Sequence, residues 1–166
     1  MPTRRLRRGR PHGRGKLPSR TRTLLGLFLA VVLALTLTAC QDADTQKQEQ
    51  LLLSSLQRSR QTSGLAPLSQ HAGLRDVARR HAEEMARTKS LVHSPNLAGR
   101  VGAVVPNWQR VGENVGYGTS MEAVHKNFMA SSGHRGNILG RYNIVGIGVS
   151  RDETGRYWVV QVFALA

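Results

Sequence analysis

The chain has only one cysteine, Cys40, so an intramolecular disulfide is excluded. It also lacks an apolar run of the roughly 20 residues that a membrane-spanning helix requires. The longest apolar stretch, residues 24–37, has 14 residues and ends close to Cys40. A stop-transfer anchor is therefore the weaker interpretation of this stretch. No internal repeat or low-complexity tract is visible along the chain.

Acidic residues are absent from residues 1–39, which hold nine of the 24 Lys and Arg residues. Residues 40–166 hold the other 15 basic residues and all 10 acidic residues. The net charge beyond residue 39 is therefore +5, whereas that of the whole chain is +14. Such a basic chain would indicate a nucleic-acid binder if it folded as one unit. Because the excess charge lies in a segment that we expect to be removed or left in the membrane, we predict no nucleic-acid partner.

The first 39 residues have the order of an export signal. An Arg-rich leader precedes the apolar stretch and small residues follow it, which is typical of a secretory signal peptide. Residues 37–40, Leu-Thr-Ala-Cys, resemble the lipobox of bacterial lipoproteins. This resemblance implies cleavage before Cys40 and attachment of a diacylglyceryl group to its thiol. Two or more acyl chains hold a protein stably, so we predict an exported protein that is lipid-anchored at the membrane surface of the cell envelope.

The mature chain of 127 residues is long enough for one domain that buries about two thirds of its unfolded surface. Residues 40–48 are polar and predict a lipidated cysteine with a short tether, followed by a domain over residues 49–166. Ser69 is the expected N-cap of the second helix, and Thr119 with Glu122 forms a capping-box pattern for the third. Helical periodicity covers residues 49–61, 70–88, 120–130 and 134–139.

Two strands are predicted at the end of the chain, over residues 143–150 and 156–165, with a turn at residues 152–155. Gly146 and Gly148 alternate with apolar residues in the first of these strands. Glycines inside a strand often mark a place where another element packs closely on the sheet.

The stretch from Ser94 to Gly118 is expected to be a long irregular loop that is packed on the domain, because it contains Trp108 and Val111. Helices followed by a hairpin predict an α+β fold in which helices and antiparallel strands form layers.

Three short motifs place titratable side chains at or next to the ends of predicted elements, where loops gather. They are His93-Ser94, Gly112-Glu113-Asn114 and Gly133-His134-Arg135. The motifs that accompany them in order through residues 50–164 are Arg60…Gly64-Leu65…Pro67-Leu68, Ala78…His81-Ala82…Met85-Ala86, Ser131-Ser132 and Asn137-Ile138-Leu139 around His134, Val145-Gly146-Ile147-Gly148-Val149, and Tyr157-Trp158…Gln161…Phe163-Ala164. In this order the motifs make the chain similar to bacterial members of the CAP superfamily, also called the SCP domain. The resemblance implies a three-layer α-β-α sandwich with a central antiparallel sheet.

The family's cleft carries two histidines and two acidic residues, and the resemblance assigns His93, Glu113 and His134 to three of these positions. The fourth, a glutamate in eukaryotic members, falls near Ser131 in this chain. This departure puts in doubt any mechanism that needs two carboxylates. The residues expected to support the cleft are Asn114, Arg135 and Ser131.

Two imidazoles and one carboxylate are a ligand set suited to a divalent metal such as zinc, with an open fourth position for water. Such a site can activate the water for hydrolysis. Without a metal, Glu113 would favour the protonated forms of His93 and His134. A polar cluster that only ties three loops together is the third interpretation.

Other titratable residues carry less specific signals. His81 lies on the apolar side of its helix and is expected in the core, whereas His71 and His125 are expected to be solvated. The second helix also has a basic face formed by Arg79, Arg80, Arg87 and Lys89. A solvated face is the usual outcome of such a pattern, and contact with anionic lipid head groups is the alternative.

The function predicted from these observations is that of a monomeric binding module, anchored to the membrane through lipidated Cys40. Its His93–Glu113–His134 cleft would take a small or extended ligand, such as a lipid, a cell-wall glycan or a peptide. A metal-dependent hydrolase that uses the same cleft and a structural envelope protein are the alternatives. No catalytic residue is assigned.

Overall fold

The computed structural model describes residues 43–166, so the predicted signal peptide and Cys40 lie outside the described residues. The first helix in this range covers residues 43–62. The elements that follow are β1 (Ser69–Gln70), α2 (Ala72–Thr88), α3 (Leu97–Gly102), β2 (Arg110–Gly118), α4 (Met121–Ala130), α5 (Ser132–Ile138), β3 (Ile144–Arg151) and β4 (Tyr157–Leu165). None of the helices between residues 43 and 166 is long and apolar enough to cross a membrane.

The four strands form one mixed sheet in the order β1-β3-β4-β2. β3 pairs with β4 in antiparallel register, from Ile144 opposite Ala164 to Arg151 opposite Tyr157. β2 is antiparallel to β4, and the two-residue strand β1 is parallel to β3. The predicted α+β class and the central sheet are confirmed, with the correction that β1 makes the sheet mixed and not purely antiparallel.

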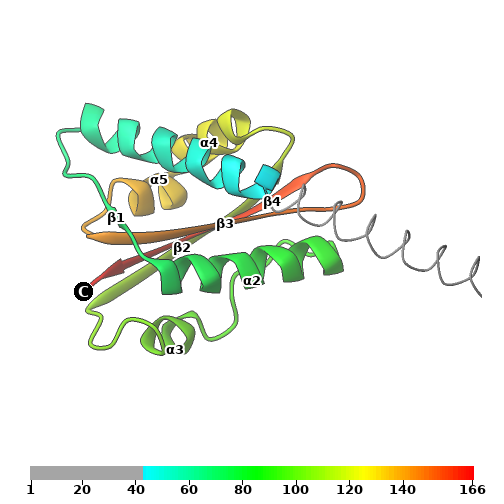
Figure 1. The fold of residues 1–166 in the computed structure, drawn as a ribbon. Coiled ribbons are helices and arrows are strands. Elements are labelled where there is room, and N and C mark those ends of the chain that lie inside the picture. The colour runs from blue at the N-terminus through cyan, green and yellow to red at the C-terminus, as the bar shows by residue number, and fades with distance from the viewer. Residues whose placement is uncertain (1–42) are drawn as a thin grey trace, which may run out of the picture. The chain divides into compact units, whose positions relative to one another are not determined.

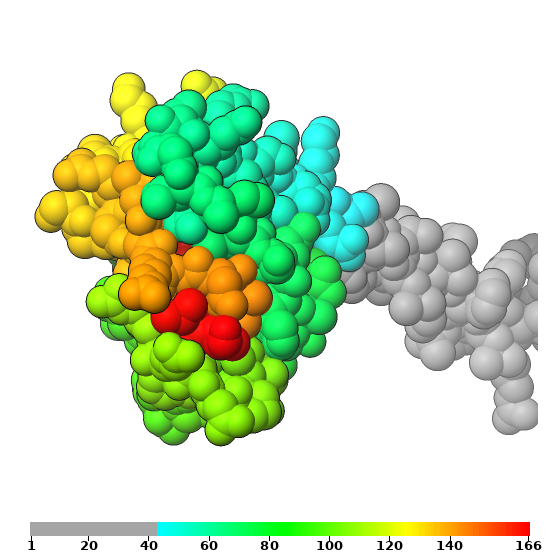
Figure 2. Space-filling view, turned by 90° about the vertical axis from the view of Figure 1, so that its left-hand side faces the viewer, coloured from blue at the N-terminus to red at the C-terminus, as the bar shows by residue number. Residues whose placement is uncertain are grey.

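Helices cover both faces of the sheet (Figure 1). α2 and α3 pack on the face that includes Trp158 and Val160, whereas the helix of residues 43–62, α4 and α5 pack on the face that includes Val159 and Phe163. Alternate residues of β4 therefore serve opposite cores, as strand geometry requires. Figure 2 shows the end of this sandwich, where the C-terminal residues lie between the α3 segment below and the segment around α5 above. The three-layer α-β-α arrangement is confirmed.

The stretch from Ser94 to Gly118, predicted to be an irregular loop, contains the helix α3 and the whole of β2. β2 forms an edge of the sheet beside β4. Its middle residues, Glu113 and Asn114, are polar but buried. They interrupt the alternation of apolar and polar residues that identifies a strand in a sequence.

Residues 43–48, which we expected to form a polar tether, are helical. The reason lies in the contacts of Asp44, whose Oδ2 accepts a hydrogen bond from Tyr157 Oη at 2.9 Å. Oδ1 of Asp44 also accepts one from Gln48 Nε2, one helical turn later. These bonds hold the first described turn of the helix against the start of β4.

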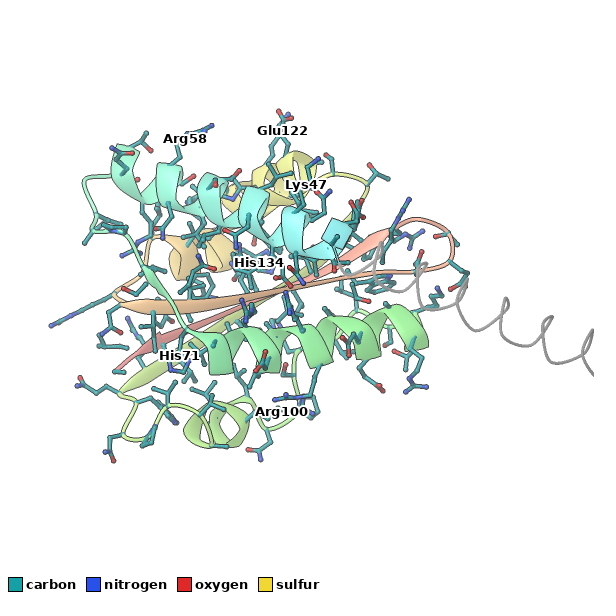
Figure 3. All side chains as sticks on the ribbon, viewed as in Figure 1. Lys47, Arg58, His71, Arg100, Glu122 and His134 are labelled. Carbon is teal, nitrogen blue, oxygen red and sulfur yellow. The ribbon has the colours of Figure 1, made fainter. Side chains whose placement is uncertain are left out.

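Two helix starts differ by one or two residues from the expected ones. His71, labelled in Figure 3, replaces Ser69 as the N-cap of α2, and its Nδ1 accepts from Leu74 N at 3.2 Å. Ser69 cannot cap the helix because it belongs to β1. Ser120 replaces Thr119 as the N-cap of α4, and its hydroxyl oxygen accepts from Ala123 N at 3.2 Å.

An ion pair to the buried carboxylate of Glu49 joins the two helical layers beside β3. Arg79 of α2 donates to both carboxylate oxygens of Glu49, at 2.7 and 2.6 Å, from the opposite layer. Glu49 is buried, and its Oε1 also lies 3.4 Å from Val149 N in β3. Because both oxygens of the buried carboxylate are hydrogen-bonded, its desolvation is compensated.

Candidate functional site

The carboxylate of Glu113 is held in place by three hydrogen bonds in the predicted site. Glu113 lies in the middle of β2, and its side chain is only 2% exposed. Oε2 accepts from Ser94 N at 2.9 Å and from His93 Nδ1 at 2.8 Å, while Oε1 accepts from Ser94 Oγ. Three donors from two successive residues therefore hold the segment between α2 and α3 against β2.

The side chain of His93 lies at the surface, with 66% of it exposed. Because a carboxylate can only accept, the Nδ1 atom of His93 donates to Glu113, and this leaves Nε2 as the free nitrogen of the ring when the ring is neutral. The neighbouring Val92 is held from the other side, since its carbonyl oxygen accepts from Nε2 of buried His81 at 2.8 Å. His81 lies in the core as expected, and its hydrogen bond also fixes the loop that carries His93.

His134 projects from α5 into a cleft of about 370 Å³ beside β2. Its ring lies 4.9 Å from that of Phe128, centroid to centroid. Burial lowers the pKa of His134, and the nearby charge of His93 lowers this pKa further. Both effects favour the neutral form of the imidazole. The cleft is lined by Leu91, Val115, Gly116, Tyr117, Val124, Asn127, Phe128, Ser131 and His134.

The structure brings the three predicted cleft residues to one region, although in different environments. His93 bonds directly to Glu113, and its charge is close enough to act on His134. His134 lines the cleft, Glu113 is buried and is not among the lining residues, and His93 is exposed at the surface.

Side-chain amides connect α5 to β2 and β4. Asn114 Nδ2 donates to His134 O at 3.1 Å and to Gln161 Oε1 at 3.0 Å. Asn137 Nδ2 donates to Asn114 Oδ1 at 2.9 Å and to Glu113 O at 3.0 Å. The network fixes the backbone on both sides of the site. Gln161 was expected only as part of the motif that resembles the family, and a polar residue within the apolar run of β4 is a second signal for it.

Of the other two supporting residues, Arg135 lies within α5 and Ser131 lies between α4 and α5. Arg135 Nη1 donates to Met129 O at 3.0 Å and so links the two helices. Ser131 occupies the N-cap position of α5 but makes no capping hydrogen bond with its side chain, and it lines the cleft instead.

The arrangement of acids and histidines bears on chemistry in two ways. Within residues 43–166, no group of three or more His, Cys, Asp or Glu side chains is placed to hold a metal ion. Both oxygens of Glu113 already accept hydrogen bonds, so metal binding by His93, Glu113 and His134 stays a prediction. Ser94 Oγ donates to Glu113 and not to an imidazole, so Ser94 does not form a serine–histidine pair in this structure.

His125 is not solvated as we expected. It is half-buried, and its Nε2 lies 2.8 Å from Ser59 Oγ of the helix of residues 43–62. Its Nδ1 is buried without a hydrogen-bond partner among the described residues. This burial lowers the pKa of His125, because it disfavours the charged form of the ring. No local pattern predicts this contact, because Ser59 and His125 are 66 residues apart along the chain.

Stability is expected to fall as the pH is lowered below about 6.5, the usual pKa of histidine. Burial lowers the pKa of both His125 and His134, so the unfolded chain takes up protons that the folded chain resists. The contribution of the two histidines to the free energy of unfolding is complete above their pKa in the unfolded chain. It is lost as the pH falls towards their lower pKa values in the folded protein. Melting temperatures between pH 7.5 and 5 measure this loss. His125→Asn should flatten the profile, whereas His71→Asn, which retains a capping acceptor, should decline like the wild type. Equal slopes for both variants would contradict the assignment.

Comparisons with known proteins agree with this architecture. The family model described as CAP, cysteine-rich secretory protein family, matches residues 53–163. A comparison with curated protein sequences gives no match.

Solved structures share the fold at low sequence identity. An outer surface protein of Borrelia burgdorferi is 15% identical, with a TM-score of 0.67 over 72% of this chain and 92% of that one. A cysteine-rich secretory protein of Staphylococcus aureus is 22% identical, with a TM-score of 0.63 over 74% of this chain and 39% of that one. An extracellular protein with an SCP domain from Bacillus anthracis is 23% identical, with a TM-score of 0.65 over 76% and 43%. This chain thus spans less than half of the latter two proteins. Since the family model covers about two thirds of the sequence, the chain belongs to the cysteine-rich secretory protein (CAP) family.

Proposed function

We propose that this CAP protein is an exported, membrane-anchored binding module whose cleft takes a ligand with an apolar face and a hydrogen-bonding group. A lipid, a cell-wall glycan and a peptide all meet this description. The observation that carries the proposal is the cleft beside β2, in which an imidazole lies among apolar and aromatic side chains. Ligand sites combine such apolar walls with a few placed polar groups.

The walls of the cleft offer two kinds of contact. Tyr117 and Leu91 are 47% and 46% exposed, which is unusual for such large side chains, and both lie at the cleft. Asn127, Ser131 and His134 supply hydrogen-bonding groups on the opposite side. A ligand that covers the exposed apolar surface while bonding to these groups would gain from both contributions.

The site is better suited to holding a ligand than to reacting with it. Glu113 is fully engaged by Ser94 and His93, so its hydrogen bonds serve to fix the loop beside the cleft. A fixed wall reduces the entropy lost on binding. The proposed place of action is the cell envelope. The signal and lipobox-like sequence up to Cys40 support it, as do fold relatives described as outer-surface and extracellular proteins.

The proposal is tested by blocking the cleft with a side chain that leaves the His93–Glu113 contact intact. Asn127 is an exposed residue of α4 that lines the cleft, so Asn127→Trp should fill it. Purified protein is incubated with a panel of bacterial lipids and peptidoglycan fragments, and retained molecules are detected by native mass spectrometry. We expect the wild type to retain a ligand and Asn127→Trp to lose at least about nine tenths of it, because a blocked pocket excludes the ligand sterically.

The matched control is Lys126→Trp, which introduces the same side chain at the exposed neighbouring position, outside the cleft lining. This variant should bind like the wild type. If the wild type retains nothing from the panel, or if both tryptophan variants bind equally, the proposed function is wrong.

A further inference from the structure

One carboxylate is held between α2 and the free edge of β3 by a defined set of donors. Arg79 of α2 donates to both carboxylate oxygens of Glu49, and Val149 N in β3 lies 3.4 Å from one of these oxygens. A Cβ at Gly148 would lie 2.2 Å from Arg79 N, so the helix backbone crosses the strand just before Val149. A guanidinium group of the helix and a backbone N–H of the strand thus bind the same carboxylate.

The same arrangement of backbone occurs one helical turn earlier, at Arg75. A Cβ at Gly146 would lie 2.2 Å from Arg75 N, which repeats the contact of the first position. Ile147 is therefore the counterpart of Val149. Backbone N–H groups of alternate residues face the same edge of a strand, so the N–H of Ile147 faces the same edge as that of Val149.

This second position has the donors but no acceptor among residues 43–166. Arg75 has no carboxylate within ion-pair distance, and its Nε atom is buried without a hydrogen-bond partner. Ile147 is buried, and β1 ends at Gln70, before it could pair with the N–H of Ile147. Leaving such groups without a partner costs free energy, so a ligand that accepts from both is favoured.

The donors of the second position lie at a pocket of about 330 Å³ between the helix of residues 43–62, the start of α2 and β3. No acidic residue lines this pocket, and it shares no lining residue with the cleft. His71 Nδ1 accepts from Leu74 N, so the Nε2 atom carries the proton of the neutral ring and can donate. The lining residues are Gln50, Gln70, His71, Ala72, Arg75, Val145, Gly146 and Ile147.

We infer that this pocket binds a small polar molecule with a carboxylate group, whose oxygens accept from Arg75 and from the N–H of Ile147. Guanidinium groups form strong, charge-assisted hydrogen bonds with carboxylates. The amides of Gln50 and Gln70 offer further hydrogen bonds to the polar remainder of the molecule. The volume is near the lower end of the range of about 300–1,000 Å³ that small-molecule sites occupy, which suits a compact ligand.

N-acetylglycine is a probe with the required charge and size, and N-acetylglycinamide is its neutral counterpart. Each is titrated into ¹⁵N-labelled protein in a phosphate-free buffer, and the signals of the Ile147 N–H and the Arg75 Nε–H are followed by NMR. N-acetylglycine should shift both signals saturably. The neutral amide should bind at least about tenfold more weakly, because hydrogen bonds between charged groups are lost.

Arg75→Gln should weaken the binding of N-acetylglycine about tenfold for the same reason, as measured at the Ile147 N–H. Arg80→Gln is the matched control, because Arg80 is exposed on the same helix outside the lining of this pocket. Its affinity for N-acetylglycine should equal that of the wild type.

A second variant supplies the carboxylate from within the chain. Gln50→Glu places an acid on the pocket wall, where it should pair with Arg75 and prevent binding of N-acetylglycine. Gln46→Glu is its control, because Gln46 is exposed on the same helix and does not line the pocket. This control should bind N-acetylglycine like the wild type, as should Asn127→Trp, which blocks the cleft.

Four results would each overturn the inference. They are the absence of saturable shifts in the wild type, equal affinity for the neutral amide, equal losses in Arg75→Gln and Arg80→Gln, and loss of binding in Asn127→Trp. Equal binding by Gln50→Glu and Gln46→Glu would also contradict it. None of these results would bear on the cleft ligand, so the two proposals fail independently.

Discussion

Replacing Gly148 with alanine is expected to lower the free energy of unfolding by about 3 kcal/mol, near the upper end of the usual cost of overpacking a core. A Cβ atom at this position would lie 2.2 Å from Arg79 N and 2.3 Å from Ala78 C. Both are backbone atoms of α2, which cannot rotate away as the end of a side chain can. The strand and the helix would have to separate, and the apolar contacts between them would be lost.

The same close approach is repeated one turn earlier in the helix. A Cβ at Gly146 would lie 2.1 Å from Leu74 C. Leu74 and Ala78 are four residues apart, a rise of about 6 Å along a helix. Gly146 and Gly148 are two residues apart, about 6.6 Å along a strand. The two spacings match, so α2 lies along β3 with one helical turn on each glycine.

Urea unfolding measures this effect as a shift in midpoint at constant slope. Gly136→Ala is the matched control, because a Cβ at Gly136 meets nothing within 4 Å and the residue lies inside α5. That variant should gain about 0.5–1 kcal/mol through helix propensity. If Gly148→Ala unfolds at the same urea concentration as the wild type, the space between α2 and β3 accommodates a Cβ atom and the prediction is wrong.

This contact is one part of the fold that could be predicted from the sequence. Glycines at alternate positions of an apolar strand indicate close packing, although they do not identify the partner element. Four of the helices and the final hairpin were also predictable, because their apolar residues follow the periods of 3.6 and 2. The first helix starts six residues earlier than expected, and α3 was missed. β2 was missed because Glu113 and Asn114 occupy its buried centre.

The candidate site could be located only through resemblance to the family. His93, Glu113 and His134 are separated by about 20 residues each, and no local pattern indicates that such distant residues meet. The bonds from Ser94 to Glu113 depend on how the loop crosses β2, which periodicity does not specify. The pairing of His125 with Ser59 likewise depends on how two helices of one layer pack. Such contacts follow from tertiary structure, and short-range sequence signals do not contain them.

Replacing Glu113 with alanine is expected to lower the free energy of unfolding by about 3 kcal/mol, because a buried acceptor of three hydrogen bonds is removed. Ser94 N and Ser94 Oγ would lose their partner while Ser94 itself is buried. Glu122→Ala is the control, since Glu122 is an exposed acid in the first turn of α4, and its change should cost less than about 0.5 kcal/mol. Amide hydrogen exchange should show faster opening of residues 90–94 in Glu113→Ala alone.

The same variant distinguishes a binding site from a polar cluster that only stabilises the fold. Leu91 lines the cleft and belongs to the loop that Glu113 holds through His93 and Ser94. Without these bonds the loop must be ordered when the ligand binds, and this ordering costs free energy. The lipid or glycan retained by the wild type should therefore bind about tenfold more weakly. Ser94→Ala, which keeps the backbone bond from Ser94 N, should show a smaller loss of the same kind. If Glu113→Ala melts earlier yet retains the ligand with unchanged affinity below its melting temperature, the carboxylate has a structural role alone.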